Sequence, residues 1–587
     1  MLLFPPSWTS AMPHLALPAL TAYLRLHGVE VIQRDLNLEI LEWMLTRDYI
    51  ETSVTRLRKR YGTRARRRSA RQVQLKREEI NWVLTNGPRL AARVEAAVNV
   101  IRSDAFFDGP TGLQAFECVL QCLEIASLPF YPASLGLSSN VPALPVDSSR
   151  NLLQMVSDPQ RNIFLDFFRG TVLTDIEREE PDLVGISIPT LDQMLAAVTL
   201  GYLIKDAGLP SHVTVGGPHI SMLREELLKV PVLFDFFDSA VVFDGERPLL
   251  RLAEALDGDR DLAQVPNLIY REGEQIRTTP CKDPVPMADL PLPDFDGLPL
   301  ERYLAPKLVL PLLTARGCYH GKCAFCNVGY GGPTGFCQLG AEQVVEQMLA
   351  LEAKYGVRHI FFADEAITPR NLRGMSSLLG DQDAPVHWGG CVRFESVLDR
   401  TLLAAMSRAG CRMLLFGLEA GAESVMKRIG KGTKLNQIGR ILRQSSQAGI
   451  WNHVFFFFGF PGETIEDAQE TVNLLYKHQQ YIHSAAFGTF LLESYAPAHR
   501  RPERYGIKHI VQDPDKDLAI YFDYEVESGM DEQLAELVAT RFLDALPEKR
   551  FGHFYLHDVY RFLYIGHLSD RRIPFPVWLT PEEGAIS

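Results

Sequence analysis

The stretch LVLPLLTARGCYHGKCAFC, residues 308–326, begins a regular α/β series and ends in a cluster of cysteines. Its apolar first half is typical of a buried strand. Further strand candidates follow in HIFFADE, HWGGCVRF, MLLFGLE, HVFFFFGF and AAFGTFLLE, separated by helical stretches such as AEQVVEQMLALEAKYG. Strands that alternate with helices favour a parallel sheet, and about six such units suit a partial barrel. We therefore expect a partial (β/α)6 barrel over residues 307–504, with its chemistry at the carboxyl ends of the strands.

A second α/β series precedes this barrel. MLLF, LALPALTAYLRLHG and VEVIQRDL predict a strand, a helix and a strand, and the pattern returns with DLVGISI, HVTVGGPHI and FDSAVVFDGERPLLRLAEAL. We expect a Rossmann-like domain over residues 1–280, with a helical insertion at about 49–178 and a proline-rich linker at 281–306. A mainly helical region, residues 505–587, follows the barrel and could cover its mouth or only extend its packing.

Composition narrows the class of protein. A length of 587 residues allows several domains, and the net charge of −12 argues against nucleic acid as the main partner. We expect no membrane span and no signal peptide, and the nine unevenly spread cysteines indicate a reducing cytoplasm. Eleven Lys or Arg residues lie between Arg56 and Arg77, either as a solvated helical face or as a docking site for an acidic partner or substrate.

The cysteine cluster predicts a metal centre. Cys318, Cys323 and Cys326 lie within nine residues, and thiolates are soft ligands that suit iron–sulfur clusters or zinc. A structural zinc site usually takes four ligands, and His320 lies at a poor spacing to be the fourth. Three ligands leave one position open, which favours a [4Fe–4S] cluster with one iron free to bind a substrate. A zinc-stabilised binding protein is the alternative from another class.

RGCYHGKCAFC resembles the signature of radical SAM enzymes, in which three cysteines hold the cluster and an aromatic residue precedes the third. Phe325 takes that aromatic place, whereas four residues, instead of the usual three, separate the first two cysteines. The resemblance implies that a [4Fe–4S] cluster cleaves S-adenosylmethionine (SAM) by one-electron reduction.

Further segments resemble the SAM contacts of this family. Asp364 and Glu365 end the second strand, where the family holds the methionyl amine; the plain alternative is a helix N-cap pair. Arg393 suits the SAM carboxylate, because a guanidinium fork matches a carboxylate. Glu419 ends the fourth strand, where the family often contacts ribose or amine. FGFPGET, residues 458–464, resembles the loop after the fifth strand. No residue is assigned a catalytic role.

The layout as a whole resembles the cobalamin-binding radical SAM family over residues 1–48 and 180–505, through VTVGGPH, VVFDGERPLLRL and LPLPDFDGLPLERYL. No histidine stands in a D-x-H-x-x-G motif, so no cobalt ligand from that motif is expected, and a domain that no longer binds cobalamin is the alternative. His14 and His219 could lie near the corrin. The implied cobalamin contacts are Ser187, Thr190, Gly216, Gly217, Pro218, Gly245 and Glu246.

The resemblance implies methyl transfer from methylcobalamin to an unactivated carbon of a metabolite or peptide. It also implies an electron donor such as a flavodoxin or ferredoxin, and strictly anaerobic activity. A cobalamin-dependent ring contraction or cyclisation uses the same parts and stays open. Methylthiolation is disfavoured because only Cys118 and Cys122 precede Cys281, and a C-terminal auxiliary cluster is disfavoured because no cysteine follows Cys411.

Overall fold

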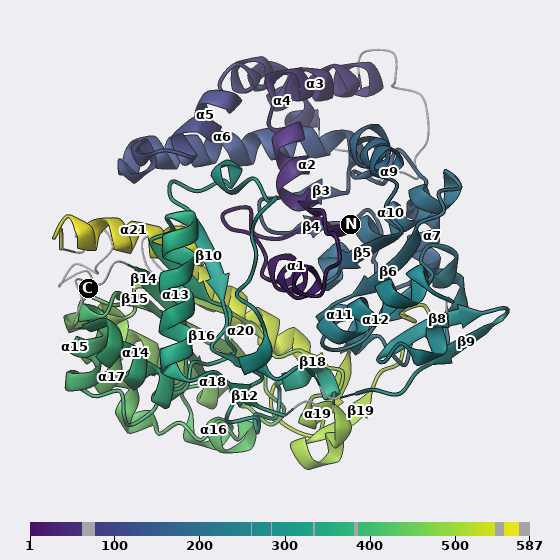
Figure 1. Ribbon diagram of the computed structural model, residues 1–587. Coiled ribbons are helices and arrows are strands. Elements are labelled where there is room, and N and C mark those ends of the chain that lie inside the picture. Colours follow the sequence, from purple (N-terminus) through teal and green to yellow (C-terminus); the bar gives the residue numbers. More distant parts are fainter. Residues whose placement is uncertain are drawn as a thin grey trace. The chain divides into compact units, whose positions relative to one another are not determined.

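The computed structural model describes residues 1–61, 77–259, 261–282, 284–332, 335–380, 386–545 and 557–574. The chain divides into two compact units, which are described separately (Figure 1). Unit 1 comprises Met1–Val285, Pro291–Lys307 and Asp513–Ala519, and unit 2 comprises Pro286–Leu290, Leu308–Gln512 and Ile520–Ser587. Most of the segment expected to be a linker therefore packs with unit 1.

Unit 1 contains a seven-stranded sheet with the strand order β2-β1-β5-β6-β7-β8-β9. The first five strands of this order pair in parallel, as the sequence predicts, and the last two add an antiparallel extension at one edge. The strands are β1 (Leu2–Phe4), β2 (Gln33–Asp35), β5 (Leu183–Ser187), β6 (His212–Gly216), β7 (Ser239–Val241), β8 (Leu268–Glu272) and β9 (Gln275–Thr278).

Helices connect these parallel strands, as in other βαβ folds. They are α1 (Ala16–Leu26), α10 (Met194–Asp206) and α11 (Pro218–Met222), and α12 (Glu246–Asp257) leads from β7 to the antiparallel extension. Gly28 follows α1 with a φ of +80°, a backbone conformation that glycine adopts without strain. Most of α10 is buried, from Met194 to Ile204, which explains its continuous apolar sequence.

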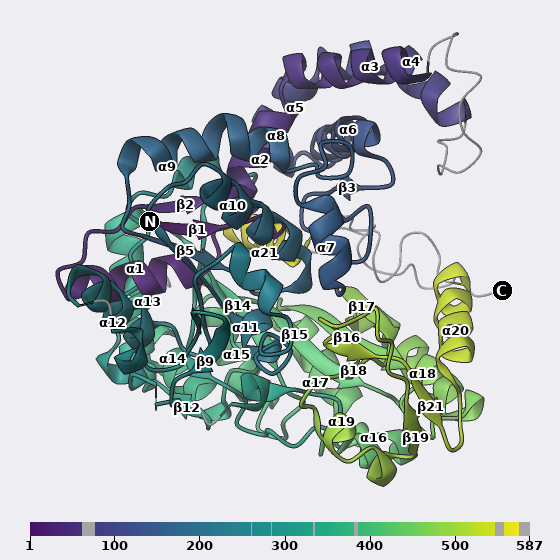
Figure 2. The ribbon, with the colours of Figure 1, turned by 90° about the vertical axis from the view of Figure 1, so that its right-hand side faces the viewer.

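A helical insertion separates β2 from β5, and Figure 2 shows its helices α3 and α4 side by side. Its elements are α2 (Leu36–Met44), α3 (Arg47–Tyr61), α4 (Arg77–Ala91), α5 (Val94–Ile101), α6 (Gly109–Ser127), α7 (Ser149–Met155), α8 (Leu165–Phe167), α9 (Leu173–Glu179) and the short hairpin β3 (Ser134–Leu135) and β4 (Asn140–Val141). Much of the basic run lies outside the described residues.

One segment of the insertion, Gly109–Phe130, is long and apolar enough to cross a bilayer by length and composition alone. However, 56% of its apolar window is buried inside the protein, as in a core helix of a soluble protein. This segment is therefore weak support for a membrane span.

Unit 2 contains a six-stranded sheet in which every neighbouring pair is parallel and the strands follow chain order. The strands are β10 (Val309–Leu312), β13 (His359–Phe362), β14 (His387–Val392), β15 (Cys411–Glu419), β16 (Trp451–Phe458) and β17 (Ser484–Thr489). All six strand candidates of the sequence are present. Parallel strands joined in sequential order have right-handed crossovers as a rule, which places the connecting helices on one face, as in a partial barrel.

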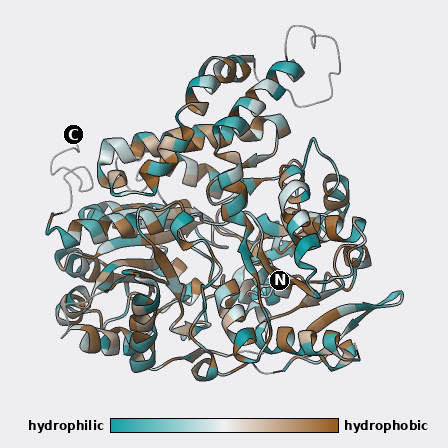
Figure 3. Cartoon of the chain, turned by 45° about the horizontal axis from the view of Figure 1, so that its top comes forward, coloured by the Kyte–Doolittle hydropathy of each residue, from teal (hydrophilic) through white to brown (hydrophobic). Residues whose placement is uncertain are grey.

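The helices of this barrel are α13 (Ala341–Tyr355), α14 (Pro369–Gly380), α15 (Arg400–Arg408), α16 (Glu423–Ile429), α17 (Leu435–Gln447) and α18 (Ile465–His478). Figure 3 shows helices that alternate between hydrophobic and hydrophilic residues along their turns. In α13, for example, Val344, Met348 and Leu351 are buried at helical spacing. Such helices bury one stripe against the sheet and expose the other.

The C-terminal region needs a partial correction, because short strands precede its helices. The strands are β19 (Ile507–Ile510), β20 (Tyr521–Phe522) and β21 (Tyr524–Val526), and the helices are α20 (Glu532–Ala545) and α21 (Asp558–Asp570). Strand β18 (Leu492–Glu493) and helix α19 (Pro497–Arg500) lie just before this region. Strand β20 pairs antiparallel with β18, and β19 pairs antiparallel with β21. The two-residue alternation of IKHI and YEV is too short to stand out from a helical pattern in the sequence.

Helix α21 packs at the amino ends of the barrel strands. The Nε2 atom of His387, the first residue of β14, is 2.7 Å from Asp570 Oδ1. The Phe562 ring lies 5.7 Å from the ring of His359, the first residue of β13, and 5.5 Å from that of Phe361. Tyr524 of the same region shares a buried cluster with Ala324 of the cysteine loop, so this region packs at both ends of the barrel strands and the two expected roles stay open.

Candidate functional site

The cysteine loop leaves the carboxyl end of β10 through a short ribbon. Strand β11 (Ala315–Arg316) pairs antiparallel with β12 (Cys337–Gln338), so the two ends of the loop are hydrogen-bonded to each other. Gly317 follows β11 with a φ of +74°. The ribbon fixes where the loop begins and returns, at the end of the barrel where parallel α/β folds bind their ligands.

The far side of the loop is held by the end of α16. The Ala324 backbone N–H donates to the Ile429 carbonyl over 2.7 Å, and His320 Nε2 lies 2.8 Å from the Gly430 carbonyl oxygen. The Phe325 ring packs edge-on against Phe457, with 5.1 Å between centroids. His320 is therefore engaged with the backbone, whereas Phe325 anchors the loop on β16.

The three cysteines of the loop are unpaired and half-buried. Burial raises the pKa of Cys323, and the nearby cations of Lys431 and Arg393 oppose that rise. Burial also raises the pKa of Cys326, together with the negative charge of Glu365. Within the described parts of the chain, no three His, Cys, Asp or Glu side chains converge closely enough to hold one metal ion. The thiols are thus gathered in one loop without forming a preassembled site for a single ion.

Asp364 and Glu365 differ in their environments. The buried Asp364 carboxylate accepts hydrogen bonds from the Thr314 N–H (2.9 Å) and the Thr314 hydroxyl (2.5 Å), and burial raises its pKa to about 6. Glu365 keeps an exposed side chain, although the surrounding protein desolvates it and raises its pKa. The N-cap alternative for this pair is wrong, because Thr368 Oγ1 accepts from Asn371 N in the first turn of α14.

Glu419 ends β15 and forms a buried ion pair. Its Oε1 accepts from Lys431 Nζ over 2.6 Å, and the two side chains are only 10% and 9% exposed. Burial alone would lower the pKa of Lys431, but Glu419 and Cys323 outweigh it and the pKa is raised. Glu419 has a φ of +67°, and a Cβ on Gly417 would lie 2.5 Å from its carboxylate. A positive φ is uncommon at a non-glycine residue, and strained backbone of this kind recurs at functional sites.

Arg393 reaches the same group of side chains from the end of β14. Its Nη2 donates to the Lys431 carbonyl over 2.6 Å and its Nε donates to Glu395 over 3.2 Å. The guanidinium also lies over the Tyr319 ring, 5.7 Å from its centroid. Lys431 was not anticipated from the sequence; the only signal was its position between two glycines directly after α16.

The loop at residues 458–464 is built around Glu463. This fully buried carboxylate accepts from the N–H groups of Gly459 (2.6 Å) and Phe460 (3.1 Å), and burial raises its pKa to about 7. A second unanticipated residue is Glu493 in β18. Burial and the nearby charge of Glu365 raise its pKa to about 7. Glu365 and Glu493 therefore share one region near Cys326.

The predicted cobalamin contacts all lie at the carboxyl edge of the parallel strands of unit 1. Ser187 ends β5 and pairs with Gly216 of β6, and Thr190 caps the following turn with Gln193. Gly217 has a φ of +111°, and a Cβ there would lie 2.8 Å from the Ile188 carbonyl oxygen. The chain's own backbone therefore requires this glycine. Pro218 opens α11, and Gly245 and Glu246 stand at the start of α12, with Glu246 buried.

Among the described residues, three side chains at this edge carry buried polar atoms that have no hydrogen-bond partner. They are the indole Nε1 of Trp8, the hydroxyl of Ser10 and both ring nitrogens of His219, and they follow β1 or β6. Buried polar groups are normally satisfied, so unpartnered ones call for a ligand or water. His14 is different, because its Nδ1 accepts from the Ala16 N–H over 3.2 Å and its ring stacks on Phe4.

Comparisons with known proteins identify a family match in unit 2. Residues 312–475 match the Radical SAM superfamily, which covers the barrel from β10 into α18. An uncharacterized methyltransferase of Pyrococcus horikoshii is 27% identical over 307 residues, which are 51% of this chain and 65% of the relative. The anaerobic magnesium-protoporphyrin IX monomethyl ester cyclase of Rubrivivax gelatinosus is 27% identical over 329 residues, which are 53% of this chain and 58% of the relative.

The chain thus spans less than two thirds of the length of both relatives. A similar solved structure is the cobalamin-dependent S-adenosylmethionine radical enzyme OxsB with aqua-cobalamin and S-adenosylmethionine bound. Its TM-score is 0.53 at 18% identity, and the match covers 69% of this chain and 64% of that one. At this identity the likeness establishes the fold.

Proposed function

We propose that this chain, which contains a radical SAM domain at residues 312–475, transfers a methyl group from methylcobalamin to an unactivated carbon of a metabolite or peptide. Such a domain implies a [4Fe–4S] cluster and SAM as cofactors. The observation that carries the proposal is the cysteine loop at the carboxyl end of six parallel strands, beside the buried Glu419–Lys431 pair. The names of the relatives support a methyltransferase type.

The cysteine loop fits a cluster. Its three half-buried thiols need a partner when they ionise, because burial disfavours a thiolate, and iron would supply the positive charge. When bound, the cluster supplies the electron that cleaves SAM. Lys431 lies near Cys323 and stabilises negative charge there, while the ribbon of β11 and β12 holds the loop in place.

The SAM contacts divide between neighbouring strand ends. We assign the methionyl amine to Glu365, because its carboxylate is exposed whereas Asp364 is engaged by Thr314. Asp364 then positions the start of the cysteine loop. Arg393 uses two of its five N–H groups on Lys431 and Glu395, which leaves donors for the SAM carboxylate. Glu419 presents its second carboxylate oxygen for a ribose or amine contact.

Unit 1 would bind cobalamin at the carboxyl edge of its parallel strands. The unpartnered Trp8, Ser10 and His219 fit this assignment, because a polar ligand there would satisfy them. The fold likeness to a cobalamin-dependent enzyme supports it further. We assign the loops after β1, β5, β6 and β7 to this site, which includes Gly216 and Gly217.

A cobalamin-dependent cyclisation is the second candidate function, because the Rubrivivax relative is named a cyclase and is as similar in identity as the methyltransferase. For either reaction we expect a small-molecule or peptide substrate and a flavodoxin or ferredoxin-like electron donor. We also expect the protein to act in a reducing cytoplasm.

Anaerobic reconstitution tests these proposals. The protein is loaded with iron, sulfide and cobalamin, then given SAM and a strong reductant, and 5′-deoxyadenosine and S-adenosylhomocysteine are measured by mass spectrometry. We expect 5′-deoxyadenosine from the wild type and none from a variant in which Cys318, Cys323 and Cys326 are alanine. Cys281→Ala, which removes an exposed thiol outside the loop, is the matched control and should retain activity.

The products separate the candidates. S-adenosylhomocysteine that depends on cobalamin indicates methyl transfer, whereas 5′-deoxyadenosine without it indicates cyclisation or rearrangement. If the protein forms neither product and holds zinc without iron, the enzymatic proposal fails and a zinc-stabilised binding protein replaces it.

A further inference from the structure

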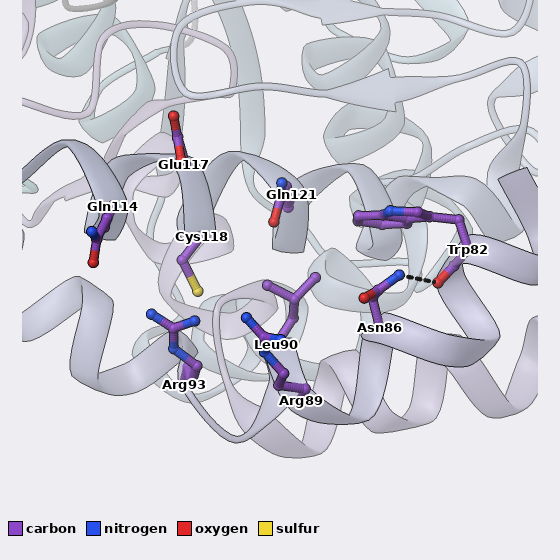
Figure 4. A pocket seen from close by; sticks show the side chains of 9 residues that line it. All are labelled: Trp82, Asn86, Arg89, Leu90, Arg93, Gln114, Glu117, Cys118 and Gln121. Carbon is purple, nitrogen blue, oxygen red and sulfur yellow. Dashed lines mark hydrogen bonds between the residues drawn. The ribbon is translucent and has the colours of Figure 1, made fainter.

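A pocket lies in the helical insertion, between α4 and α6 of unit 1 (Figure 4). Its volume is about 520 Å³, within the range of small-molecule sites. Its lining follows helical spacing on both sides, which places the side chains of each helix on one face. The residues are Trp82, Asn86, Arg89, Leu90 and Arg93 from α4 and the turn after it, and Gln114, Glu117, Cys118 and Gln121 from α6.

The charge in this pocket comes from two arginines. Arg89 and Arg93 are exposed, and across the described residues neither guanidinium has a hydrogen bond or an ion pair. Figure 4 shows both side chains directed toward the space below Cys118, whereas Glu117 points away from them. Two cations held together without a counter-charge attract an anion.

The rest of the lining combines an aromatic ring with amide groups. Trp82 is 38% exposed, which is unusual for so large an apolar side chain, and its ring forms one wall of the pocket. Asn86 donates to the Trp82 carbonyl over 3.0 Å and keeps its carboxamide oxygen for other partners. Gln114 and Gln121 add amide groups from α6. An exposed indole face beside amides suits a planar ring that carries polar groups.

We infer that this pocket binds an organic phosphate that carries a planar ring, at a site separate from the radical SAM domain. Guanidinium forks pair with phosphate or carboxylate oxygens. A single carboxylate is matched by one fork, whereas a dianionic phosphate offers three acceptor oxygens and can pair with both Arg89 and Arg93. The phosphate lies at the arginine end and the ring stacks on Trp82 at the other.

Isothermal titration of the full-length protein with AMP tests the inference, because AMP joins a phosphate to a planar base. We expect a dissociation constant below about 1 mM. The double variant Arg89→Gln with Arg93→Gln keeps polar side chains of similar reach and should weaken AMP binding at least tenfold. Trp82→Ala should weaken it as well. Adenosine, which lacks the phosphate, and ribose 5-phosphate, which lacks the base, should each bind more weakly than AMP.

The matched control is Arg58→Gln with Lys59→Gln, which removes the same charge from exposed positions of α3 outside the pocket. It should bind AMP as the wild type does, and circular dichroism should be unchanged in all variants. The inference is overturned if the wild type does not bind AMP, if the pocket variant binds it equally well, or if the control loses binding to the same extent. SAM and the cluster are not needed, so failure here leaves the proposed function standing.

Discussion

Replacing Lys431 by methionine removes the cation that faces Glu419 in the barrel. The two atoms of the ion pair are 2.6 Å apart and both side chains are about nine-tenths buried. At that distance an effective dielectric constant of about 20 gives an attraction of about 6 kcal/mol, which the desolvation of two charges opposes. The raised pKa of Lys431 indicates that attraction outweighs desolvation.

Removing one partner of such a pair leaves a buried charge uncompensated, which typically costs about 3–5 kcal/mol. We therefore expect Lys431→Met to lower the opening free energy of β15 and β16 by that amount. The double variant Lys431→Met with Glu419→Gln should recover most of the loss, because no unpaired charge remains.

Hydrogen exchange of peptides from β15 and β16 measures this change strand by strand, which suits a chain of two units better than a single unfolding midpoint. Lys434→Met, an exposed lysine three residues along, is the control and should stay within about 0.5 kcal/mol of the wild type. A Lys431→Met variant that exchanges like this control would refute the electrostatic reasoning, and so would a double variant that is no better than the single one.

Three further perturbations test the packing of each unit. Burial lowers the pKa of His387 to about 4, below the unfolded value of about 6.5, so the unfolded chain binds more protons between these values. The free energy of unfolding should fall by about 3 kcal/mol as the pH drops through that window. An opening free energy of α21, measured by hydrogen exchange relative to the intrinsic rate, that stays constant over the window contradicts this. Phe562→Ala should lower the free energy of unfolding by about 3–5 kcal/mol, because the ring is fully buried. Urea unfolding of the protein measures this loss. Gly217→Ala should destabilise unit 1 more than Gly28→Ala does. Both glycines have a positive φ, but only a Cβ at Gly217 would lie 2.8 Å from a carbonyl oxygen. Equal shifts of the melting temperature in the two variants would contradict this.

Local patterns in the sequence were sufficient for the six strands of the barrel and for the type of its domain. The six strands of unit 2 are short apolar runs set between amphipathic helices, so the hydrophobic pattern of each segment is enough to identify it. The cysteine motif is equally local, because its three thiols are only eight positions apart along the chain. The match to the Radical SAM superfamily confirms the resemblance that this motif carries.

Only the tertiary structure decided which charged strand ends act together. Asp364 and Glu365 are adjacent in the chain, yet one is engaged by Thr314, 50 residues away, and the other is exposed. Lys431 meets Glu419 because β15 bulges near its end and the loop after α16 folds back over it. Such pairings depend on the three-dimensional placement of distant backbone segments and on the desolvation that follows, and neither is encoded in the spacing of residues along the chain.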